Sequence, residues 1–435
     1  MPSTLLKNAR LLDPWTSLDQ RGDLLAIDGR IAAIGAEAAP GVPETAVVIE
    51  CGGHCLSPGL VDMRVALREP GHEYVESLAI SSQAAAVGGI TSLVGLPDTD
   101  PVLDDVALVE FITRRAQKVG LVNIYAFAAA TKGLRGQELT EMGLMASAGA
   151  LGFTDGSRAI ADALVMRRAL SYARTFDLLI VQHPEEPRLA AGGAATEGEI
   201  ATRLGLPGIT PAAELIMIER DLRLVEITGG RYHAAHVSTA AAIDVIRKAK
   251  RRGLPVTCDT APPYFALNET AIGEYRTFAK LSPPLRSETD RLAVVEGLKD
   301  GTIDAIASDH TPQDQDAKRQ PYASAACGMV GLETLLPLAL ALYHGAGLPL
   351  LKVLRKLTQG PADILRLPVG RLAVGAPADL VLFDLDRPWR IDAKSFKSKA
   401  RNTLFDGHPV QGKVLRTFVA GRMAHAAPEA DSAVA

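Results

Sequence analysis

Histidine and aspartate side chains recur where short apolar segments of this sequence end. The four that could do chemistry together are Asp155, His183, His236 and Asp309. A catalytic zinc ion takes three protein ligands and a water molecule, and both neutral imidazole and carboxylate bind it well. Asp155, His183 and His236 would provide three ligands, and Asp309 could accept the proton of the water. These residue types would therefore allow a metal-dependent hydrolase with one zinc ion at most.

The elements that must position these groups form a repeating pattern. Segments between the apolar runs, such as Ile80–Val87, are rich in helix formers and apolar at helical spacing. Alternating strands and helices predict an α/β fold, a (β/α)8 TIM-like barrel, in which catalytic groups gather at the C-terminal strand ends. An open doubly wound sheet is the alternative, but no Gly-x-Gly-x-x-Gly turn follows an early strand. The eight expected strands are Gly59–Arg64, Thr91–Leu96, Val122–Phe127, Leu151–Thr154, Leu178–His183, Tyr232–Val237, Pro255–Asp259 and Ile303–Asp309.

Both ends of the chain have a different pattern, with short strand-like pieces broken by Gly, Pro and Asp-Gly turns. We expect residues 1–55 and 367–425 to form a small composite β-domain beside a barrel domain of residues 56–366. Residues 426–435 are small and polar, and we expect a disordered tail there. The expected strand regions of the β-domain are Leu5–Leu12, Leu24–Ile27, Arg30–Ile34, Val47–Glu50, Gly370–Asp384 and Gly412–Val419.

Composition excludes several classes of protein. The 435 residues carry 46 Lys and Arg against 50 Asp and Glu, which argues against nucleic-acid binding. The basic cluster Lys248–Arg252 is interpreted as a solvent-facing helix end. We find no apolar run of membrane-spanning length and no secretion signal. Without Cys-x-x-Cys spacing, Cys51 and Cys55 are interpreted as small buried hydrophobes rather than metal ligands, and we expect a cytoplasmic protein with reduced thiols.

Motifs along nearly the whole chain resemble those of the dihydroorotase family, within the amidohydrolase superfamily. The resemblance implies a zinc hydrolase of de novo pyrimidine biosynthesis that interconverts carbamoyl aspartate and dihydroorotate. The motifs that carry it are Pro58–Asp62, Gly152–Asp155, His236–Thr239, Pro283–Arg286, Ala307–His310 and Val330–Thr334.

The resemblance also implies a role for each candidate residue. The carboxylate at the position of Asp155 bridges or binds zinc in the family, and the histidines matching His183 and His236 hold metal. The aspartate matching Asp309 ligates metal and acts as general acid/base. The arginine matching Arg68 binds the substrate carboxylate.

Departures from the family pattern are concentrated at this predicted site. Arg64 and Ala66 stand where the family's Asp-x-His-x-His has its two histidines after Asp62. A guanidinium is permanently charged, and a methyl group has no lone pair to donate. Asp98 replaces a substrate-binding asparagine and would repel the dianionic carbamoyl aspartate. Further departures are Ala261–Tyr264 for Thr-Pro-His-His, Ser282 for an asparagine and Gln313 for a histidine.

The pattern leaves rival functions. Bacterial family members that lack the strand-one histidines are structural partners of aspartate carbamoyltransferase, so the first hypothesis is a catalytically degenerate homologue with that role. In this case Arg64 pairs with Asp309 or Asp155 and fills the pocket, and no zinc is bound. The second hypothesis is an active dihydroorotase, or a related cyclic-amide hydrolase, with a single zinc and a small pyrimidine precursor as substrate. A protein that senses a pyrimidine intermediate without turnover has no specific sequence support. We expect a homo-oligomer in each case.

Overall fold

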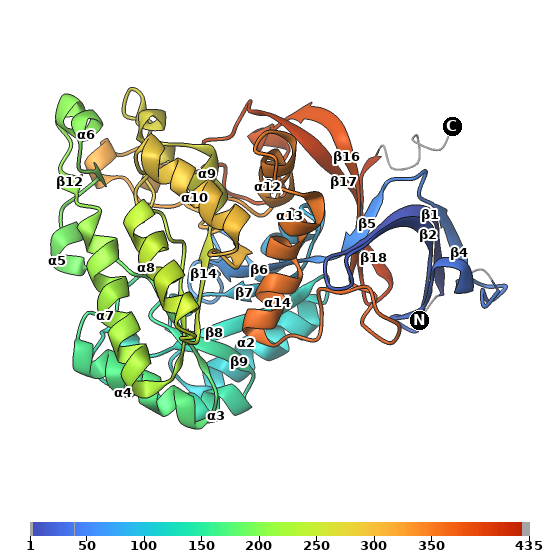
Figure 1. Ribbon diagram of the computed structural model, residues 1–435, viewed down its shortest axis with the longest axis horizontal. Helices are drawn as coiled ribbons and strands as arrows, with labels where there is room; N and C mark the ends of the chain where they lie inside the picture. The colour runs from blue at the N-terminus through green and yellow to red at the C-terminus, as the bar shows by residue number, and fades with distance from the viewer. Residues whose placement is uncertain (1–2, 39, 429–435) are drawn as a thin grey trace.

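The part of the chain described by the computed structural model, residues 3–38 and 40–428, contains two eight-stranded sheets and a two-stranded ribbon. Figure 1 shows the first sheet, built from both flanks of the chain, at one end of the molecule and a barrel surrounded by helices at the other. The ribbon pairs β11 (Ala195–Thr196) with β12 (Gly208–Ile209) outside the barrel. No helix of the described residues is long and apolar enough to cross a membrane.

The second sheet is the predicted barrel. Its described strands are parallel and follow one another in chain order from the first to the last. A bridge between Val65 and His310 joins the first strand to the chain beyond the last, and the Ala66 N–H donates to the His310 carbonyl (2.8 Å). The fold prediction is therefore confirmed. The strands are β6 (Leu60–Val65), β7 (Ile90–Gly95), β8 (Asn123–Ala129), β9 (Ala150–Thr154), β10 (Leu179–Gln182), β13 (Arg231–Ala234), β14 (Val256–Thr260) and β15 (Ala305–Ile306).

The last barrel strand is shorter than the sequence predicts. Only Ala305–Ile306 of the expected Ile303–Asp309 pairs as a strand. Asp309 has a left-handed backbone (φ 51°), which is incompatible with a continuing strand and turns the chain into the mouth of the barrel. The apolar run that predicted the strand belongs partly to the core instead, since Ile303 is fully buried.

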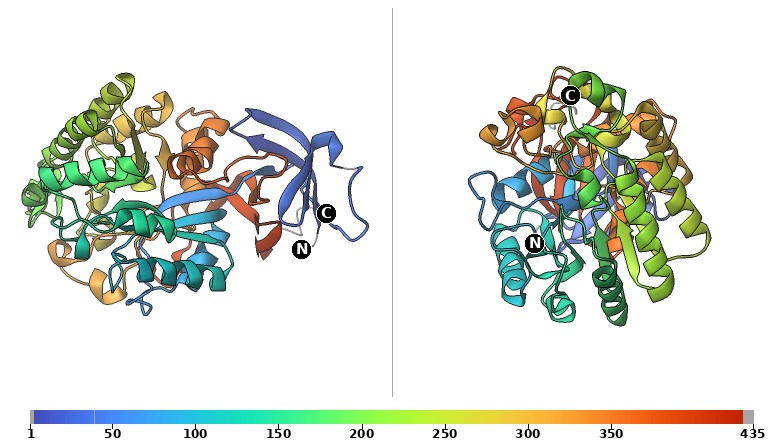
Figure 2. Two further views of the ribbon diagram at one scale, coloured as in Figure 1. Left: turned by 90° about the horizontal axis from the view of Figure 1, so that it is seen from below. Right: turned by 90° about the vertical axis from the view of Figure 1, so that its left-hand side faces the viewer.

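Helices surround the barrel, as the end-on view in Figure 2 shows. Several begin at a polar side chain that accepts hydrogen bonds from the first-turn N–H groups, such as Ser77, Asp162 and Thr239. The basic cluster lies in the last turn of α8, as predicted. The longer helices are α1 (Leu78–Val87), α2 (Val106–Val119), α4 (Ala163–Thr175), α7 (Ala212–Thr228), α8 (Ala240–Arg251), α10 (Glu288–Asp300), α12 (Leu335–His344) and α13 (Leu350–Leu357). The shorter ones are α3 (Met142–Ser147), α5 (Pro187–Ala190), α6 (Glu199–Leu204), α9 (Pro262–Ala266), α11 (Gln315–Lys318) and α14 (Gln359–Leu365).

The sheet of the flanks joins the two ends of the chain. Its β5 pairs antiparallel with β16, with Pro58 opposite Leu380, so the N- and C-terminal parts form one surface. Its strands are β1 (Thr4–Asp13), β2 (Leu18–Ile27), β3 (Arg30–Ile34), β4 (Val47–Glu50), β5 (Cys55–Pro58), β16 (Leu380–Arg390), β17 (Pro409–Val419) and β18 (Arg422–Ala426). Of the residues predicted to form a disordered tail, Ala426 ends β18, and 429–435 lie outside the described residues.

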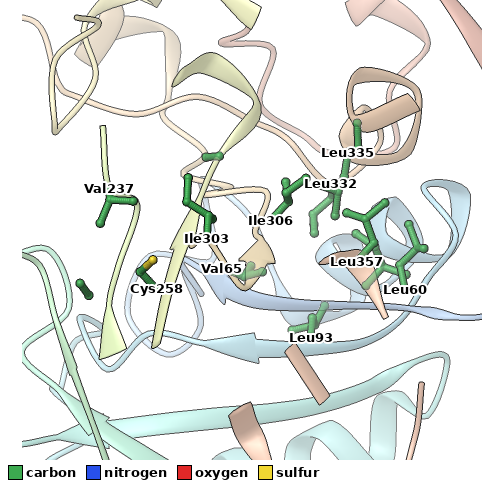
Figure 3. Packing of buried hydrophobic residues seen from close by; sticks show 14 of the residues in the cluster. Leu60, Val65, Leu93, Val237, Cys258, Ile303, Ile306, Leu332, Leu335 and Leu357 are labelled. Carbon is green, nitrogen blue, oxygen red and sulfur yellow. The ribbon is translucent and has the colours of Figure 1, made fainter. Parts of the chain in front are cut away.

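Buried aliphatic side chains fill the space between the barrel strands and the helices. Figure 3 shows Leu60 of β6 beside Leu332, Leu335 and Leu357 from the last part of the barrel. Cys51 and Cys55 are also buried, and burial raises the pKa of each thiol to about 12. Both thiols are therefore protonated at neutral pH, as expected of small hydrophobes rather than metal ligands.

Candidate functional site

Four of the candidate side chains form one line of contacts at the C-terminal end of the barrel. Arg64 lies at the end of β6, and His183 follows β10 directly. His236 lies two residues beyond β13, and Asp309 lies three beyond β15. Residues far apart in the sequence thus meet because parallel strands end on the same side of the barrel.

The first contact is an ion pair between Arg64 and Asp309. The Arg64 Nε atom lies 2.8 Å from Asp309 Oδ1, and the side chains are only 5% and 18% exposed. This confirms the interpretation that Arg64 pairs with a carboxylate of the pocket. Ala66, at the second histidine position, is buried and has only its methyl group to present.

His236 continues the line from Asp309 to His183. Its Nδ1 lies 3.3 Å from Asp309 Oδ2, and its Nε2 lies 2.7 Å from His183 Nδ1. Burial, together with the charge of Arg64, lowers the pKa of His236 to about 4. His236 is therefore a neutral imidazole at pH 7. Its backbone is left-handed (φ 38°), and its N–H donates to the Asp259 carboxylate, which holds this conformation in place.

Asp309 is an ionised carboxylate. Burial acts to raise its pKa, but His236 and Arg64 outweigh burial and hold the pKa below the usual range. A carboxylate with a lowered pKa is a weaker base. The general-base role that the resemblance implies for Asp309 is thus opposed by the side chain that replaces a histidine.

Asp155 is directed toward Thr131. Its Oδ1 accepts from the Thr131 N–H (2.9 Å) and its Oδ2 accepts from the Thr131 hydroxyl. Burial raises the pKa of Asp155, although these hydrogen bonds oppose the shift. Thr131 carries no signal in the sequence that would have marked it as a partner of Asp155, because it follows a different strand, β8.

The resemblance implies zinc, and the side chains at the barrel mouth fit it only in part. Two imidazole nitrogens on one tetrahedral zinc lie about 3.3 Å apart, so His183 and His236 would have to separate slightly. Among the described residues, no group of three or more His, Cys, Asp or Glu side chains is arranged to hold a metal ion. The residues do not fit a two-zinc centre, since Arg64 and Ala66 provide no ligand. A single zinc on Asp155, His183 and His236 stays a prediction.

His183 contacts two residues, Ser282 and Glu185, that were not among the predicted site residues. The Ser282 hydroxyl oxygen lies 3.3 Å from both His183 Nε2 and Glu185 Oε2. Glu185 Oε2 also lies 3.6 Å from His183 Nε2. Burial acts to raise the pKa of Glu185, but the neighbouring His183 outweighs it and the pKa is lowered. The only sequence signal for Glu185 was its place two residues after His183.

The predicted substrate-binding residues lie at the same end of the barrel. Arg68 donates from Nε and Nη2 to the Pro312 carbonyl, at 3.1 and 2.9 Å. Asp98 lies against Gly156, where a Cβ atom would be 3.4 Å from the Asp98 Cβ. Gly156 directly follows Asp155, so Asp98 and Asp155 are close neighbours.

Two further residues that depart from the family pattern, and the retained His310, have structural contacts. Tyr264 is buried in α9, and its hydroxyl donates to the Pro283 carbonyl (2.8 Å). The Gln313 amide donates to the Cys327 carbonyl (2.7 Å). His310, the neighbour of Asp309, is buried against Glu76, with His310 Nε2 2.7 Å from Glu76 Oε1. These three contacts tie the loops around the site to one another. The chain of contacts from Arg64 through Asp309 and His236 to His183 forms the centre of the site.

An open cleft of about 920 Å³ leads to His183. The loops after β8, β9 and β10 line it, with Arg135, Arg158 and Arg168 on its walls and Glu185 beside His183. A small molecule could reach the candidate site by this route.

Comparisons with known proteins agree with this fold. A model of the family described as dihydro-orotase-like matches residues 53–242, and a model of the amidohydrolase family matches residues 295–411. The L-hydantoinase (dihydropyrimidinase) of Arthrobacter aurescens superposes with a TM-score of 0.85 at 27% identity, over 97% of this chain and 96% of that one. The dihydropyrimidinase of Brevibacillus agri, with a TM-score of 0.81 at 20% identity, supports the fold alone.

The barrel, its flanking sheet and the two matching family models define a protein of the amidohydrolase superfamily. A dihydroorotase of Anaplasma phagocytophilum (strain HZ) is 46% identical over 97% of this chain and 94% of its own length. One of Syntrophus aciditrophicus (strain SB) is 45% identical over 97% and 99%. The chain belongs to the dihydroorotase family, as its motifs indicate.

Proposed function

We propose that this chain acts in pyrimidine biosynthesis, in the cytoplasm, as a dihydroorotase-family protein without dihydroorotase catalysis and as a structural partner of aspartate carbamoyltransferase. The observation that carries the proposal is the ion pair of Arg64 with Asp309, in which Arg64 stands where the family pattern has the first of two zinc-binding histidines. The names of the relatives support the pathway. The partnership rests on the resemblance to family members that lack the same histidines.

The ion pair opposes hydrolysis in two ways. A cation about 4 Å from the guanidinium would be repelled by on the order of 4 kcal/mol per unit charge at an effective dielectric constant near 20. Asp309, held by Arg64 and His236, is also a poor acceptor for the proton of a water nucleophile. If the ion pair occupies the catalytic centre, the protein would act by binding a partner at its surface.

Zinc content and dihydroorotate hydrolysis of the purified protein, each with and without added zinc, test the absence of catalysis. We expect far less than one zinc per chain and no turnover above buffer. Near-stoichiometric zinc, with turnover that His236→Ala abolishes, would establish a one-zinc enzyme and contradict the proposal.

Co-expression with the aspartate carbamoyltransferase of the same organism tests the partnership. We expect the two chains to elute together in size-exclusion chromatography as a defined complex, built on a homo-oligomer of this chain. His183→Ala and Asp309→Ala should leave the complex and the transferase activity intact, because neither side chain would be used chemically. Separate elution at micromolar concentrations would contradict the scaffold role.

One observation favours the alternative of a single-zinc cyclic-amide hydrolase. His183 Nδ1 and His236 Nε2 face each other, and His236 is neutral, as a metal ligand must be. These two nitrogens would hold the ion, Asp155 would have to turn away from Thr131 to join them, and the metal would supply an activated water. The zinc measurement separates this alternative from the scaffold.

A further inference from the structure

A second cleft, of about 520 Å³, lies at the N-terminal end of the barrel strands, opposite the mouth. Three of its lining residues stand where strands begin: Arg231 is the first residue of β13, Thr257 is the second of β14, and Asp304 directly precedes β15. The end of α10 and parts of α13 and α14 complete its walls. The cleft is therefore separate from the candidate site, and its volume is typical of small-molecule sites.

Two of the three carboxylates that line this cleft are already neutralised from outside it. Asp300 Oδ2 lies 2.8 Å from Arg247 Nε. Asp304 Oδ2 is paired with Lys250 Nζ. Both cations belong to α8 and do not line the cleft. The third carboxylate, Asp363, is the one that remains to balance the cations of the cleft.

The cations of the cleft outnumber that one carboxylate. Lys299 is paired with Glu296 of its own helix, 2.9 Å away. The negative end of the α13 dipole attracts basic side chains in its last turn, but it is equivalent to only about half a charge. The cations left without an ion-pair partner in the described part of the chain are Arg231, Lys352, Arg355 and Lys356.

Two of these four cations are held in place by backbone carbonyls. Arg231 donates from Nη2 to the Ile364 carbonyl (2.7 Å) and from Nη1 to the Asp177 carbonyl (3.1 Å). Lys356 is only 8% exposed, and its Nζ donates to the Ile303 carbonyl. Burial lowers the pKa of both side chains. A carbonyl oxygen satisfies a hydrogen bond but carries no counter-charge, so these buried cations still lack a compensating anion.

The surplus of positive charge selects the type of ligand. A phosphoryl group carries about two negative charges at neutral pH and three acceptor oxygens. Arginine binds such oxygens in pairs, and lysine binds them as a point charge. None of the described residues that line the cleft is aromatic, so the cleft offers no face on which a base could stack. We propose that these four cations bind a diphosphate group, either free or esterified, at the N-terminal end of the barrel.

Calorimetric titration of the full-length protein, at about 0.15 M salt and with a chelator present, tests this proposal. Pyrophosphate is the free probe, adenosine diphosphate is the esterified one, and sulfate is the control for simple attraction of a dianion. We expect saturable binding of both diphosphates with similar affinity, about tenfold or more tighter than that of sulfate. No saturable binding of pyrophosphate, or equal binding of sulfate, would overturn the proposal. A tenfold preference for adenosine diphosphate would also overturn it, because the base would then need an aromatic face that this cleft lacks.

A double variant, Lys352→Gln with Arg355→Gln, locates the binding. Both side chains are exposed, so their loss should leave the fold intact. We expect pyrophosphate to bind about tenfold or more weakly. The matched control is Arg223→Gln with Lys248→Gln, which removes the same charges from exposed positions on α7 and α8 that are already paired with carboxylates. An equal loss in both double variants would mean that net charge alone attracts the anion, and would overturn the proposal.

The variant Asp363→Asn should have the opposite effect. It removes the carboxylate that remains unneutralised and retains an oxygen to accept from the Gln359 amide (3.1 Å). We expect pyrophosphate to bind about threefold or more tightly, a gain that a damaged fold would not produce. Unchanged or weaker binding would contradict the assignment of Asp363 to this site. Because the cleft lies at the other end of the barrel from Arg64 and Asp309, the result does not depend on zinc, turnover or a transferase partner.

Discussion

The mouth of the barrel has two sides that differ in what they could do chemically. On the side of β10 and β13, His183 and His236 present facing imidazole nitrogens 2.7 Å apart. On the side of β6, Arg64 forms an ion pair with Asp309 and Ala66 has no polar group. Both sides are built on strands of the same parallel sheet, with equally buried neighbours.

The difference shows that β6 keeps its place in the barrel with Arg64 and Ala66 at the two histidine positions. The core that holds β6 consists of aliphatic side chains such as Leu60 and Val65. The charges of Arg64 and Asp309 are paired with each other, so neither buried charge is left alone. The chemistry at the strand ends can therefore change while the strands remain.

The largest change should come from restoring the missing side. The double variant Arg64→His, Ala66→His removes the guanidinium and adds two imidazoles, so we expect zinc content to rise from near zero to about one ion per chain or more. Plasma emission spectrometry after dialysis measures it. Turnover should remain low because Asp98 still repels the carboxylated substrate. The single variant Ala66→His, which retains Arg64, is the control and should gain far less zinc.

The next largest effect should come from breaking the support of the β13 side. Glu214 is fully buried in α7 and accepts hydrogen bonds from Ser238 and Thr239 just after His236, beside Arg286. Glu214→Ala would leave Arg286 without its carboxylate, and we expect a loss of about 3–5 kcal/mol in the free energy of unfolding. Chemical denaturation measures this loss. Glu219→Ala, on the same helix, should change stability by less than about 0.5 kcal/mol, and equal effects of the two variants would contradict the assignment.

The pH dependence of stability should report the neutral state of His236. Its pKa is about 4 in the folded protein against 6.5 as the ordinary value, so the unfolded chain binds an extra proton between these limits. Stability from this group is therefore complete above pH 6.5 and falls as the pH drops toward 4, by at most about 1.4 kcal/mol per pH unit. Denaturation at a series of pH values should show a shallower slope in His236→Gln. An identical slope would mean that His236 does not titrate as described.

The smallest effect should come from freeing Asp155. Thr131→Val removes the hydroxyl that donates to Asp155 but leaves the backbone hydrogen bond, and we expect a loss of about 1–2 kcal/mol. Thr131→Ser retains the hydroxyl and should lose less. If the Val variant also gains zinc, the hydrogen bond from Thr131 is what keeps Asp155 from the two histidines. Zinc binding would then need no histidine on the β6 side.

Much of the fold could be predicted because local patterns decide it. All eight predicted barrel strands correspond to observed ones, since apolar runs of four to eight residues between helix-like segments have few other structures available. Two strands of the flanking sheet, Cys55–Pro58 and Arg422–Ala426, were not predicted. Both are short, and each exists because it pairs with a strand distant in the sequence or on the far side of a turn.

The amino-acid sequence by itself determined which groups reach the mouth of the barrel, since the strand that carries Arg64, Ala66 or His183 is set by its local pattern. It also determined that neither Arg64 nor Ala66 offers an imidazole at the end of β6. The tertiary structure alone decided the partners: Arg64 with Asp309 rather than Asp155, Asp155 with Thr131, and Ser282 with His183 and Glu185. The physical reason is that hydrogen bonds and ion pairs depend on distances of a few tenths of an ångström between side chains on different strands. Those distances follow from the closure of the barrel, which no local pattern records.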